Sequence, residues 1–232
     1  MSEEIIANPL GIKLAVFDLD GTLVDAFEDI AAAVNYMLAR DGLPPRTVEE
    51  VKRHVGKGVR MLVKGILATD DEALVDEKVR VLTDYYTEHP IRTTRLYKGV
   101  PEALRKLRQA GIKLAVASNK PHPLTYFILD ALAVAPYLNW IIGASEKFPR
   151  KPAPDILFHL MKESLATPQQ TIVVGDSNTD VEFARAAGVP VVCVSYGQCT
   201  REELESFAPD AIVDSMPEFL NRLREGSLFE KK

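Results

Sequence analysis

The hydrophobic and polar positions of the chain form two different patterns. Short runs of consecutive apolar residues, many of them β-branched, stand near the start of the chain and again through its second half. Such runs are typical of strands buried on both faces of a parallel sheet. The strands predicted in this way cover residues 14–17, 114–117, 171–174, 190–194 and 211–213, and residues 140–142 fit either a strand or a core segment.

Helical spacing separates the later strands. Val100, Leu104 and Leu107 share one helix face, and Gly111 fits the end of that helix. A second helical pattern over residues 181–187 also ends at a glycine. Capping boxes, which mark helix starts, occupy residues 47–50, 200–203 and 215–218. Because strands and helices alternate, the sequence predicts an α/β fold with a parallel sheet.

Residues 26–90 show helical spacing and no strand pattern. The apolar stripes consist of Phe27, Ile30, Val34 and Met37, of Val59, Leu62, Val63 and Ile66, and of Leu74, Val75, Leu82 and Tyr86. We therefore expect an α/β protein whose Rossmann-like parallel sheet core carries an inserted all-helical cap domain. The predicted domains are a discontinuous core of residues 1–24 and 93–232 and a cap of residues 25–92.

Composition narrows the classes of function. The 232 residues are 47% hydrophobic, which is ample for a core, and the formal net charge is −5. This charge gives no basic footprint for nucleic acid and no polybasic segment for an acidic membrane surface. With two cysteines, no secretory signal pattern and no long apolar run, we expect a cytoplasmic protein without membrane or nucleic-acid partners. Either a monomer or a homodimer is compatible with the sequence.

Polar side chains follow three of the predicted strands. Asp18 and Asp20 come directly after the first strand, Ser118 and Asn119 after the second, and the acidic run 175–180 after the third. A further loop contains the sequence RKPAPD, from residue 150 to residue 155. In open α/β sheets, ligands bind beyond the carboxyl ends of the strands, so we expect these groups to meet around one crevice.

The charges in that crevice indicate its ligand. Asp18, Asp20, Asp176 and Asp180 would repel one another if all stayed ionised without compensation. A hard divalent cation with oxygen ligands is the natural counter-charge, and Mg²⁺ fits best. Lys151 would add a second compensating charge. A metal, a lysine, a serine and free backbone N–H groups together indicate a phosphoryl-transfer site.

These motifs resemble those of the haloacid dehalogenase-like phosphatases. DLDGT (18–22), Ser118, Lys151 and GDSNTD (175–180) occur in the order typical of that family, and the helical insertion follows the first strand as in its capped members. The chain is similar in particular to the phosphoglycolate phosphatase branch. This closer resemblance includes SNKPHP, RKPAPD, VGDSNTDVEFARAAG, the later SYG and the stretch from Val55 to Val63.

The resemblance implies a role for each acid. Asp18 would be the nucleophile that forms an aspartyl-phosphate, and Asp20 would protonate the leaving oxygen and then activate water. Asp18, the main-chain carbonyl of Asp20 and the carboxylate of Asp176 would bind Mg²⁺. Asp180 would orient Lys151 or a metal-bound water.

The same resemblance implies a phosphate-binding set. Ser118 and the Asn119 amide would hold phosphoryl oxygens, while Lys151 would balance the charge on nucleophile and phosphate. Gly21 would let the backbone turn tightly beside the phosphate, and Thr22 would add a hydroxyl. Such a site acts mainly through positioning and electrostatics.

Structural roles compete with several of these assignments. Asp-Gly pairs are common in turns, Ser118 fits a helix cap, Lys151 fits a surface loop, and Asp180 fits a cap for a helix beginning near Val181. The occurrence of all motifs together favours the functional roles. Lys57 and Arg60 follow flexible glycines, so they either reach over the site to a substrate carboxylate or are ordinary exposed residues.

The leading hypothesis is a Mg²⁺-dependent phosphatase for a small phosphate ester, with 2-phosphoglycolate as the favoured substrate. The same core would also suit a sugar-phosphate phosphatase or mutase, or a pyrophosphatase. A non-catalytic sensor of phosphate ligands is a further alternative, although the complete set of Asp18, Asp20, Ser118, Lys151 and Asp176 argues against it.

Overall fold

A computed structural model describes residues 6–230 of the chain. Its centre is a six-stranded parallel sheet with the strand order β5-β4-β1-β6-β7-β8. The strands are β1 (Leu14–Phe17), β4 (Lys113–Pro121), β5 (Trp140–Ala144), β6 (Thr171–Gly175), β7 (Val191–Val194) and β8 (Ala211–Val213). The predicted α/β class is confirmed, and residues 140–142 belong to a strand. Within the described residues, no helix combines the length and the apolar character needed to cross a membrane.

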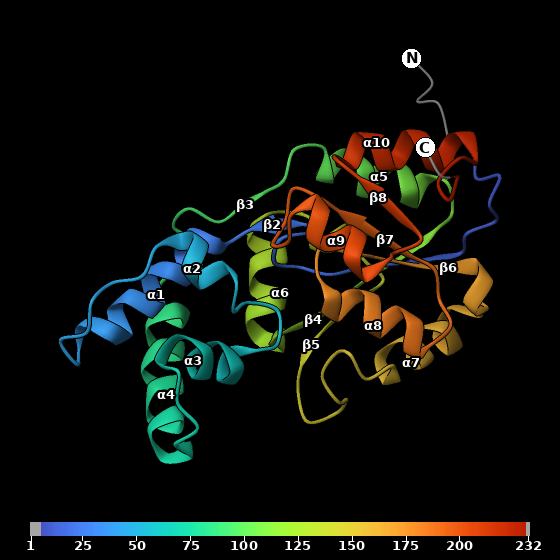
Figure 1. The fold of residues 1–232 in the computed structure, drawn as a ribbon. Helices are drawn as coiled ribbons and strands as arrows, with labels where there is room; N and C mark the ends of the chain where they lie inside the picture. Colours follow the sequence, from blue (N-terminus) through green and yellow to red (C-terminus); the bar gives the residue numbers. More distant parts are fainter. Residues whose placement is uncertain (1–5, 231–232) are drawn as a thin grey trace.

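Helices cover both faces of the sheet (Figure 1), so the strands β1, β6 and β7 are buried on both sides, whereas the edge strand β5 is only partly buried. One face packs against α5 (Val100–Gln109), α6 (His122–Ala131) and α10 (Met216–Glu225), and the other against α7 (Asp155–Ser164), α8 (Asn178–Ala186) and α9 (Arg201–Phe207). Two short 3₁₀ turns, η1 (Ala135–Tyr137) and η2 (Pro168–Gln170), precede β5 and β6. Successive side chains of a strand point to opposite faces of the sheet. Because helices cover both faces, side chains on either face are buried, which explains the continuous apolar runs in the sequence.

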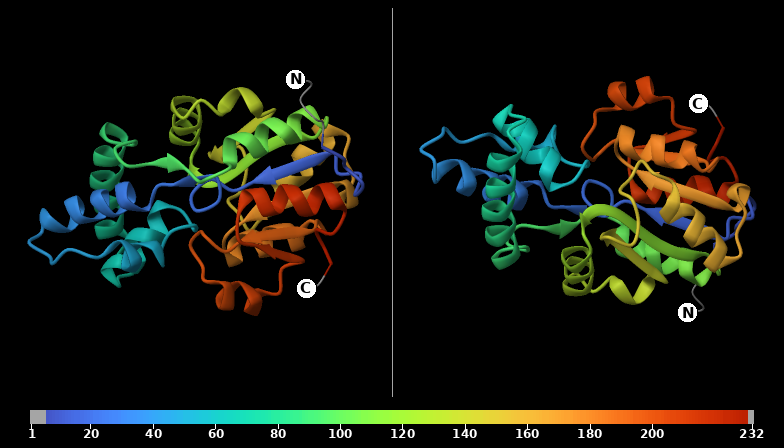
Figure 2. Two further views of the ribbon diagram at one scale, coloured as in Figure 1. Left: turned by 90° about the horizontal axis from the view of Figure 1, so that it is seen from above. Right: turned by 90° about the horizontal axis from the view of Figure 1, so that it is seen from below.

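The helices of residues 27–88 form a group that lies beside the sheet in both views of Figure 2. They are α1 (Phe27–Ala39), α2 (Val48–Lys52), α3 (Val59–Leu67) and α4 (Glu72–Glu88). The chain enters this group through β2 (Val24–Asp25) and leaves through β3 (Arg95–Leu96), and the two short strands pair antiparallel. All four helices lie where the apolar stripes and the capping box predict them. The division into a core and a cap of residues 25–92 remains our prediction.

Asp29 on α1 binds residues 92–94, the segment through which the chain leaves the helical group. Its buried carboxylate accepts hydrogen bonds from the backbone N–H groups of Arg92, Thr93 and Thr94 and from both threonine hydroxyls, over distances of 2.6–3.1 Å. Burial acts to raise the pKa of this carboxyl, but the bonds from Thr94 and Thr93 outweigh it and lower the pKa. The charge of Asp29 is therefore stabilised by the segment that precedes β3.

Two helix starts and one strand end differ from the sequence-based expectation. Helix α8 begins at Asn178 rather than near Val181, because Ser177 is its N-cap and Asp180 completes a capping box inside the first turn. At the start of α10, the Ser215 hydroxyl accepts a hydrogen bond from the Glu218 N–H. The Glu218 carboxylate accepts from the N–H of Asp214 rather than that of Ser215, so the predicted capping box is only half formed. Strand β4 continues to Pro121, four residues beyond its predicted end.

Candidate active site

The sheet order brings three polar strand ends together. Strand β1 lies between β4 and β6, so Asp18 after β1, Ser118 in β4 and Asp176 after β6 share one edge of the sheet. The backbone N–H of Asp18 donates to Val174 O at 2.9 Å, which extends the pairing of β1 with β6 up to the acid itself. Parallel pairing on both sides therefore holds the Asp18 backbone rigidly.

Lys151 provides the positive charge predicted for this edge. Its ammonium lies 2.6 Å from Asp18 Oδ1 and 2.7 Å from Asp180 Oδ1, and only 3% of its side chain is exposed. Burial acts to lower the pKa of Lys151, but the attraction of Asp18 and Asp180 outweighs burial and raises it. The lysine therefore stays charged, and a role as an exposed loop residue is excluded.

The acids around Lys151 carry more negative charge than one lysine can balance. Carboxylate oxygens of Asp18, Asp176 and Asp180 lie within 4.8 Å of one another. Burial raises the pKa of Asp18 to about 7, with Lys151 opposing the rise and Asp180 and Asp20 adding to it. Burial, followed by the charges of Asp18 and Asp180, raises the pKa of Asp176 well above its usual value. An unfavourable cluster of hard oxygen donors is the environment that a divalent cation would relieve.

The residues present fit such a cation. Asp180 is already engaged, since its Oδ2 accepts bonds from the N–H groups of Asp176 and Ser177 and from the Ser177 hydroxyl. Among the described residues, the Asp180 carboxylate thus accepts four hydrogen bonds, against two at the carboxylate of Asp176 and one at that of Asp18, which favours Asp18 and Asp176 as the carboxylates for a metal. The side chain of Asp20 lies outside the cluster, and a role for its main-chain carbonyl as a metal ligand remains a prediction.

Asp176 is positioned by groups from two other segments. It accepts a hydrogen bond from the Thr22 hydroxyl at 3.2 Å and another from the Gln198 N–H at 2.6 Å. Gly21 has a φ of +90°, and a Cβ there would stand 1.9 Å from Asp176 Oδ2. A Cβ on Gly197 would also collide with Asp176. Gly21 is thus needed both for its backbone conformation and for the space that Asp176 fills, whereas the Thr22 contact to phosphate remains a prediction.

Ser118 and Asn119 lie on the opposite side of Asp18 from Asp176. Ser118 is almost fully buried and accepts a bond from the Lys120 N–H, and α6 begins only after Pro121, so Ser118 is not the helix cap. The Asn119 carboxamide is already used: Oδ1 accepts from the Lys151 N–H, and Nδ2 donates to the Lys151 carbonyl and to Gly56 O. Asn119 therefore ties the lysine loop and the helical group to β4.

Asp20 has a partner that the sequence alone did not indicate. Both of its carboxylate oxygens lie 3.0 Å from the Lys120 ammonium, and both side chains are nearly buried. The same ammonium lies 4.6 Å from the centroid of the Tyr86 ring on α4. Burial acts to lower the pKa of Lys120, but the charge of Asp20 and the neighbouring Tyr86 raise it overall. Asp18 and Asp20 thus each form an ion pair with a different lysine.

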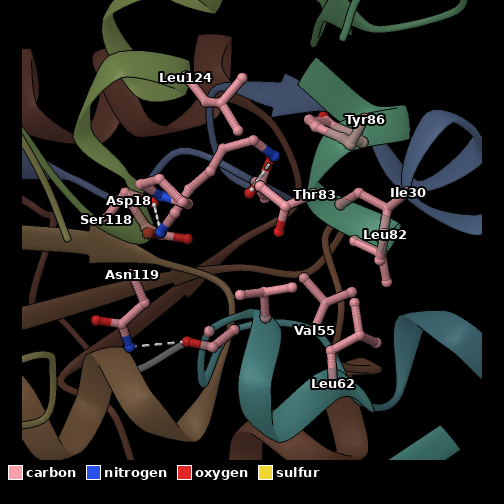
Figure 3. Close-up of a pocket in the computed structure, with 16 residues that line it drawn as sticks. Asp18, Ile30, Val55, Leu62, Leu82, Thr83, Tyr86, Ser118, Asn119 and Leu124 are labelled. Atoms are coloured by element: carbon pink, nitrogen blue, oxygen red, sulfur yellow. Dashed lines mark hydrogen bonds and ion pairs between the residues drawn. The ribbon is translucent and has the colours of Figure 1, made fainter. Parts of the chain in front are cut away.

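A pocket separates the sheet edge from the helical group, and Figure 3 shows its two sides. Asp18, Ser118 and Asn119 occupy one side, while the other is mainly apolar and includes Leu82 and Tyr86 of α4. The remaining apolar residues of the lining are Ile30, Val55, Val59, Leu62, Pro121 and Leu124. The motif acids therefore face a space that the helices close from the far side.

The structure places the two predicted cap cations away from this pocket. Arg60 forms ion pairs with Glu72 and Asp76 of α4, within the helical group. Lys57 is exposed and lines a different hollow, next to Ser177. Neither side chain contributes to the lining that contains Asp18 and Asp20. Their contact with substrate remains a prediction, and the cation that the pocket does contain is Lys120.

Gln198 is a further residue that the motifs did not identify. Besides donating its backbone N–H to Asp176, it donates from Nε2 to the carbonyls of Lys52 and Val55 at 2.8 and 2.9 Å. One residue thus connects the acid cluster to the end of α2. The late SYG motif lies just before it and was the only sequence signal nearby.

Comparison with known proteins agrees with this architecture. The family model described as haloacid dehalogenase-like hydrolase matches residues 15–194. A phosphoglycolate phosphatase of Pseudomonas putida strain KT2440 is 37% identical over 211 residues, covering 88% of this chain and 77% of that protein. Phosphoglycolate phosphatase 1 of Pseudomonas aeruginosa is 34% identical over 215 residues, covering 90% of this chain and 78% of that protein.

Solved structures give the same result. A predicted phosphoglycolate phosphatase from Haemophilus somnus superimposes with a TM-score of 0.85 at 30% identity, covering 91% of this chain and 97% of that one. A predicted phosphatase from Clostridium acetobutylicum gives a TM-score of 0.84 at 26% identity, with coverages of 92% and 99%. The family match includes the strands that carry Asp18, Ser118 and Asp176. The chain therefore belongs to the haloacid dehalogenase-like hydrolases.

Proposed function

We propose that this protein is a Mg²⁺-dependent phosphatase that hydrolyses 2-phosphoglycolate to glycolate and phosphate through an aspartyl-phosphate on Asp18. The observation that supports this most directly is the Lys151 ammonium, held between Asp18 and Asp180 beside Asp176, behind a pocket whose lining includes Asp18 and Asp20. The names of the relatives support the choice of substrate.

Asp18 begins the reaction as a nucleophile. A carboxylate oxygen of Asp18 forms a bond to phosphorus while the bond from phosphorus to the ester oxygen breaks. Lys151 lies 2.6 Å from Asp18 Oδ1, close enough to balance charge on the nucleophile and the incoming phosphoryl group. Ser118 and the Asn119 backbone N–H would hold phosphoryl oxygens, since the Asn119 carboxamide is occupied by the lysine loop and Gly56.

Asp20 acts first as the general acid and then as the general base. As an acid, it donates a proton to the leaving oxygen, so glycolate departs with a hydroxyl group. As a base, it then takes a proton from water, whose oxygen attacks phosphorus and displaces Asp18. Phosphate leaves, and the Asp18 carboxylate is restored. Asp20 is suited to this role because the pocket is open to it and Asp18 lies two residues before it at the same strand end.

Mg²⁺ would be held by Asp18, Asp176 and the Asp20 main-chain carbonyl, and when bound it would neutralise and orient the phosphoryl group. Asp180 would keep Lys151 aligned from behind. We also propose that residues 25–92 act as a cap that shields the site from water during the reaction. A cytoplasmic location and a monomeric or dimeric state remain predictions from the sequence.

Steady-state assays on a substrate panel test the proposal. Purified protein with Mg²⁺ would be offered 2-phosphoglycolate, pyrophosphate, sugar phosphates and nucleotides, and both free phosphate and the organic product would be measured. We expect the highest kcat/KM for 2-phosphoglycolate. Isomerised sugar phosphate without free phosphate would instead identify a mutase, and no turnover of any substrate would contradict the phosphatase function.

A further inference from the structure

Tyr86 has an unsatisfied hydroxyl at the pocket wall. Among the described residues, its Oη is the only buried side-chain nitrogen or oxygen without a hydrogen bond of ordinary geometry, and the Lys120 ammonium is the polar group near it. The residue is 5% exposed and belongs to the pocket lining. Leaving a buried hydroxyl without a partner destabilises the folded state. Such a cost is expected where the missing partner is supplied by a ligand.

Lys120 presents its ammonium beside that hydroxyl. It lies over the Tyr86 ring at 4.6 Å from the centroid and 3.0 Å from both Asp20 oxygens. Lys120 comes from β4 and Tyr86 from α4, so the pair spans the sheet edge and the helical group. Within the lining, Lys120 is the only cationic side chain, since Lys151 lies behind Asp18 and is not part of it. Apart from Thr83, one turn earlier on α4, the rest of the wall near Tyr86 is apolar.

The charge on these groups suits an anion. Burial raises the pKa of Tyr86, so its hydroxyl keeps the proton that it would donate, and Lys120 stays positively charged. The Lys120 ammonium has three N–H donors, so it can contact a second carboxylate that lies near Asp20 while it keeps its contact with Asp20.

We infer that Lys120 and the Tyr86 hydroxyl form the subsite that binds the carboxylate of the leaving group. This inference rests on the proposed function and adds the residues that select the substrate. In 2-phosphoglycolate, one methylene group separates the ester oxygen from the carboxyl carbon. A proton passed from Asp20 to that oxygen therefore places the carboxylate close to Asp20, where Lys120 and Tyr86 stand. The ammonium would pair with the carboxylate, and the hydroxyl would donate to it.

Ethyl phosphate provides a matched comparison, because it replaces the carboxylate of 2-phosphoglycolate with a methyl group and keeps the ester linkage. The measured quantity is the ratio of kcat/KM for 2-phosphoglycolate to kcat/KM for ethyl phosphate. We expect Tyr86→Phe to lower this ratio about tenfold, because it removes one hydrogen bond to a charged group. Lys120→Met should lower the ratio at least roughly 30-fold, because it removes the ion-pairing partner.

Using a ratio separates recognition from chemistry. Loss of Lys120 also removes the partner of Asp20. The resulting loss of catalysis would lower kcat/KM equally for both substrates and would therefore leave their ratio unchanged. Tyr86→Phe keeps the ring and its packing, so it remains informative if Lys120→Met fails to fold. Tyr126→Phe removes a hydroxyl from an exposed ring on α6 outside the pocket lining and serves as the control, with an unchanged ratio expected. Equal losses on both substrates in the Tyr86 and Lys120 variants would refute the subsite, as would a ratio that falls only in Lys57→Met.

Failure of the proposed substrate can be distinguished from failure of the subsite. If the wild type hydrolyses phosphate esters but not 2-phosphoglycolate, the substrate is wrong. The ratio is then measured with O-phosphoserine and O-phosphoethanolamine, which differ only by a carboxylate. A wild-type preference for O-phosphoserine that falls in Tyr86→Phe supports the subsite, and the absence of such a preference overturns it.

Discussion

Two sites in this chain bury aspartates in opposite ways. At the sheet edge, Asp18 and Asp176 lie with Asp180 around one lysine, and burial raises the pKa of both Asp18 and Asp176. At the exit of the helical group, Asp29 is surrounded by three backbone N–H groups and two hydroxyls, and its pKa is lowered. The first group of charges is under-compensated, whereas the second is fully satisfied.

The difference indicates that hydrogen-bond donors, rather than burial alone, decide whether the charge of a buried aspartate is stabilised. Asp29 holds two chain segments together and has no capacity left for a ligand. Asp18 has one fixed partner and faces a pocket, so its unfavourable charge is available for a metal and a phosphoryl group. If this interpretation is correct, removing each charge should have opposite effects on stability and very different effects on turnover.

The largest effect is expected for Asp18→Asn. The amide cannot act as the nucleophile, so we expect kcat to fall by at least roughly 10³-fold. Stability should not fall, because one member of a repelling cluster loses its charge while Lys151 keeps Asp180. Phosphate release and thermal melting of the same preparation measure both quantities. Turnover near the wild-type value would refute the nucleophile, and a large loss of stability would refute the contrast with Asp29.

Gly21→Ala should have the next largest effect. Its Cβ would overlap Asp176 Oδ2 and force that carboxylate to move, so we expect kcat/KM to fall about 100-fold, as for a small misplacement of catalytic groups. Gly11→Ala is the matched control, because Gly11 also has a positive φ, of +64°, but has no atom within 4 Å of the added Cβ. Its cost should be limited to backbone strain, at about 1 kcal/mol of stability. Equal activity losses in both variants would show that the crowding of Asp176 is unimportant.

The sequence predicted the fold and the acid cluster well because their signals are local or follow a general rule. Apolar runs mark the strands, and the rule that carboxyl ends of parallel strands share an edge brings Asp18, Ser118 and Asp176 together. The sequence did not predict the contacts of Lys120, Tyr86 and Asp29. Lys120 adjoins a predicted site residue, but its contact with Asp20 spans 100 positions, and the partners of Asp29 lie 63–65 positions away. Such pairings depend on how the helical group packs, which no local pattern encodes.

The next largest effect is expected in the pH dependence of stability, which should differ between the Asp18 cluster and the Asp29 site. The pKa of Asp18 is about 7 in the fold against 3.8 for the ordinary side chain. Between these values the folded state holds a proton that the unfolded chain has released, so this acid favours folding at low pH and the contribution is lost as pH rises toward 7. Without Mg²⁺, wild type should lose about 2–4 kcal/mol relative to Asp18→Asn between pH 4 and pH 8.

Urea unfolding with a chelator present, at several pH values, measures that difference. Added Mg²⁺ should restore stability at high pH in the wild type, because the cation binds the ionised acids of the folded state only. Asp18→Asn should gain less, since it has lost one of the proposed metal ligands. Parallel pH profiles for the two proteins would show that Asp18 carries no raised pKa, and identical gains with Mg²⁺ would remove Asp18 from the metal site.

The smallest effect is expected for Asp29→Asn. This substitution should lower the stability of the fold, whereas Asp18→Asn should not. The amide keeps one acceptor oxygen but turns an NH₂ group toward backbone donors, so we expect about 1–3 kcal/mol of destabilisation at pH 7. Because the folded pKa of Asp29 lies below 3.8, its contribution is present above that pH and is lost as pH falls through the folded pKa. The gap between wild type and Asp29→Asn in urea unfolding should therefore narrow below about pH 4, whereas the Asp18 gap widens toward pH 8. A constant Asp29 gap across this range would mean that the hydrogen bonds, and not the charge they stabilise, fasten the helical group to β3.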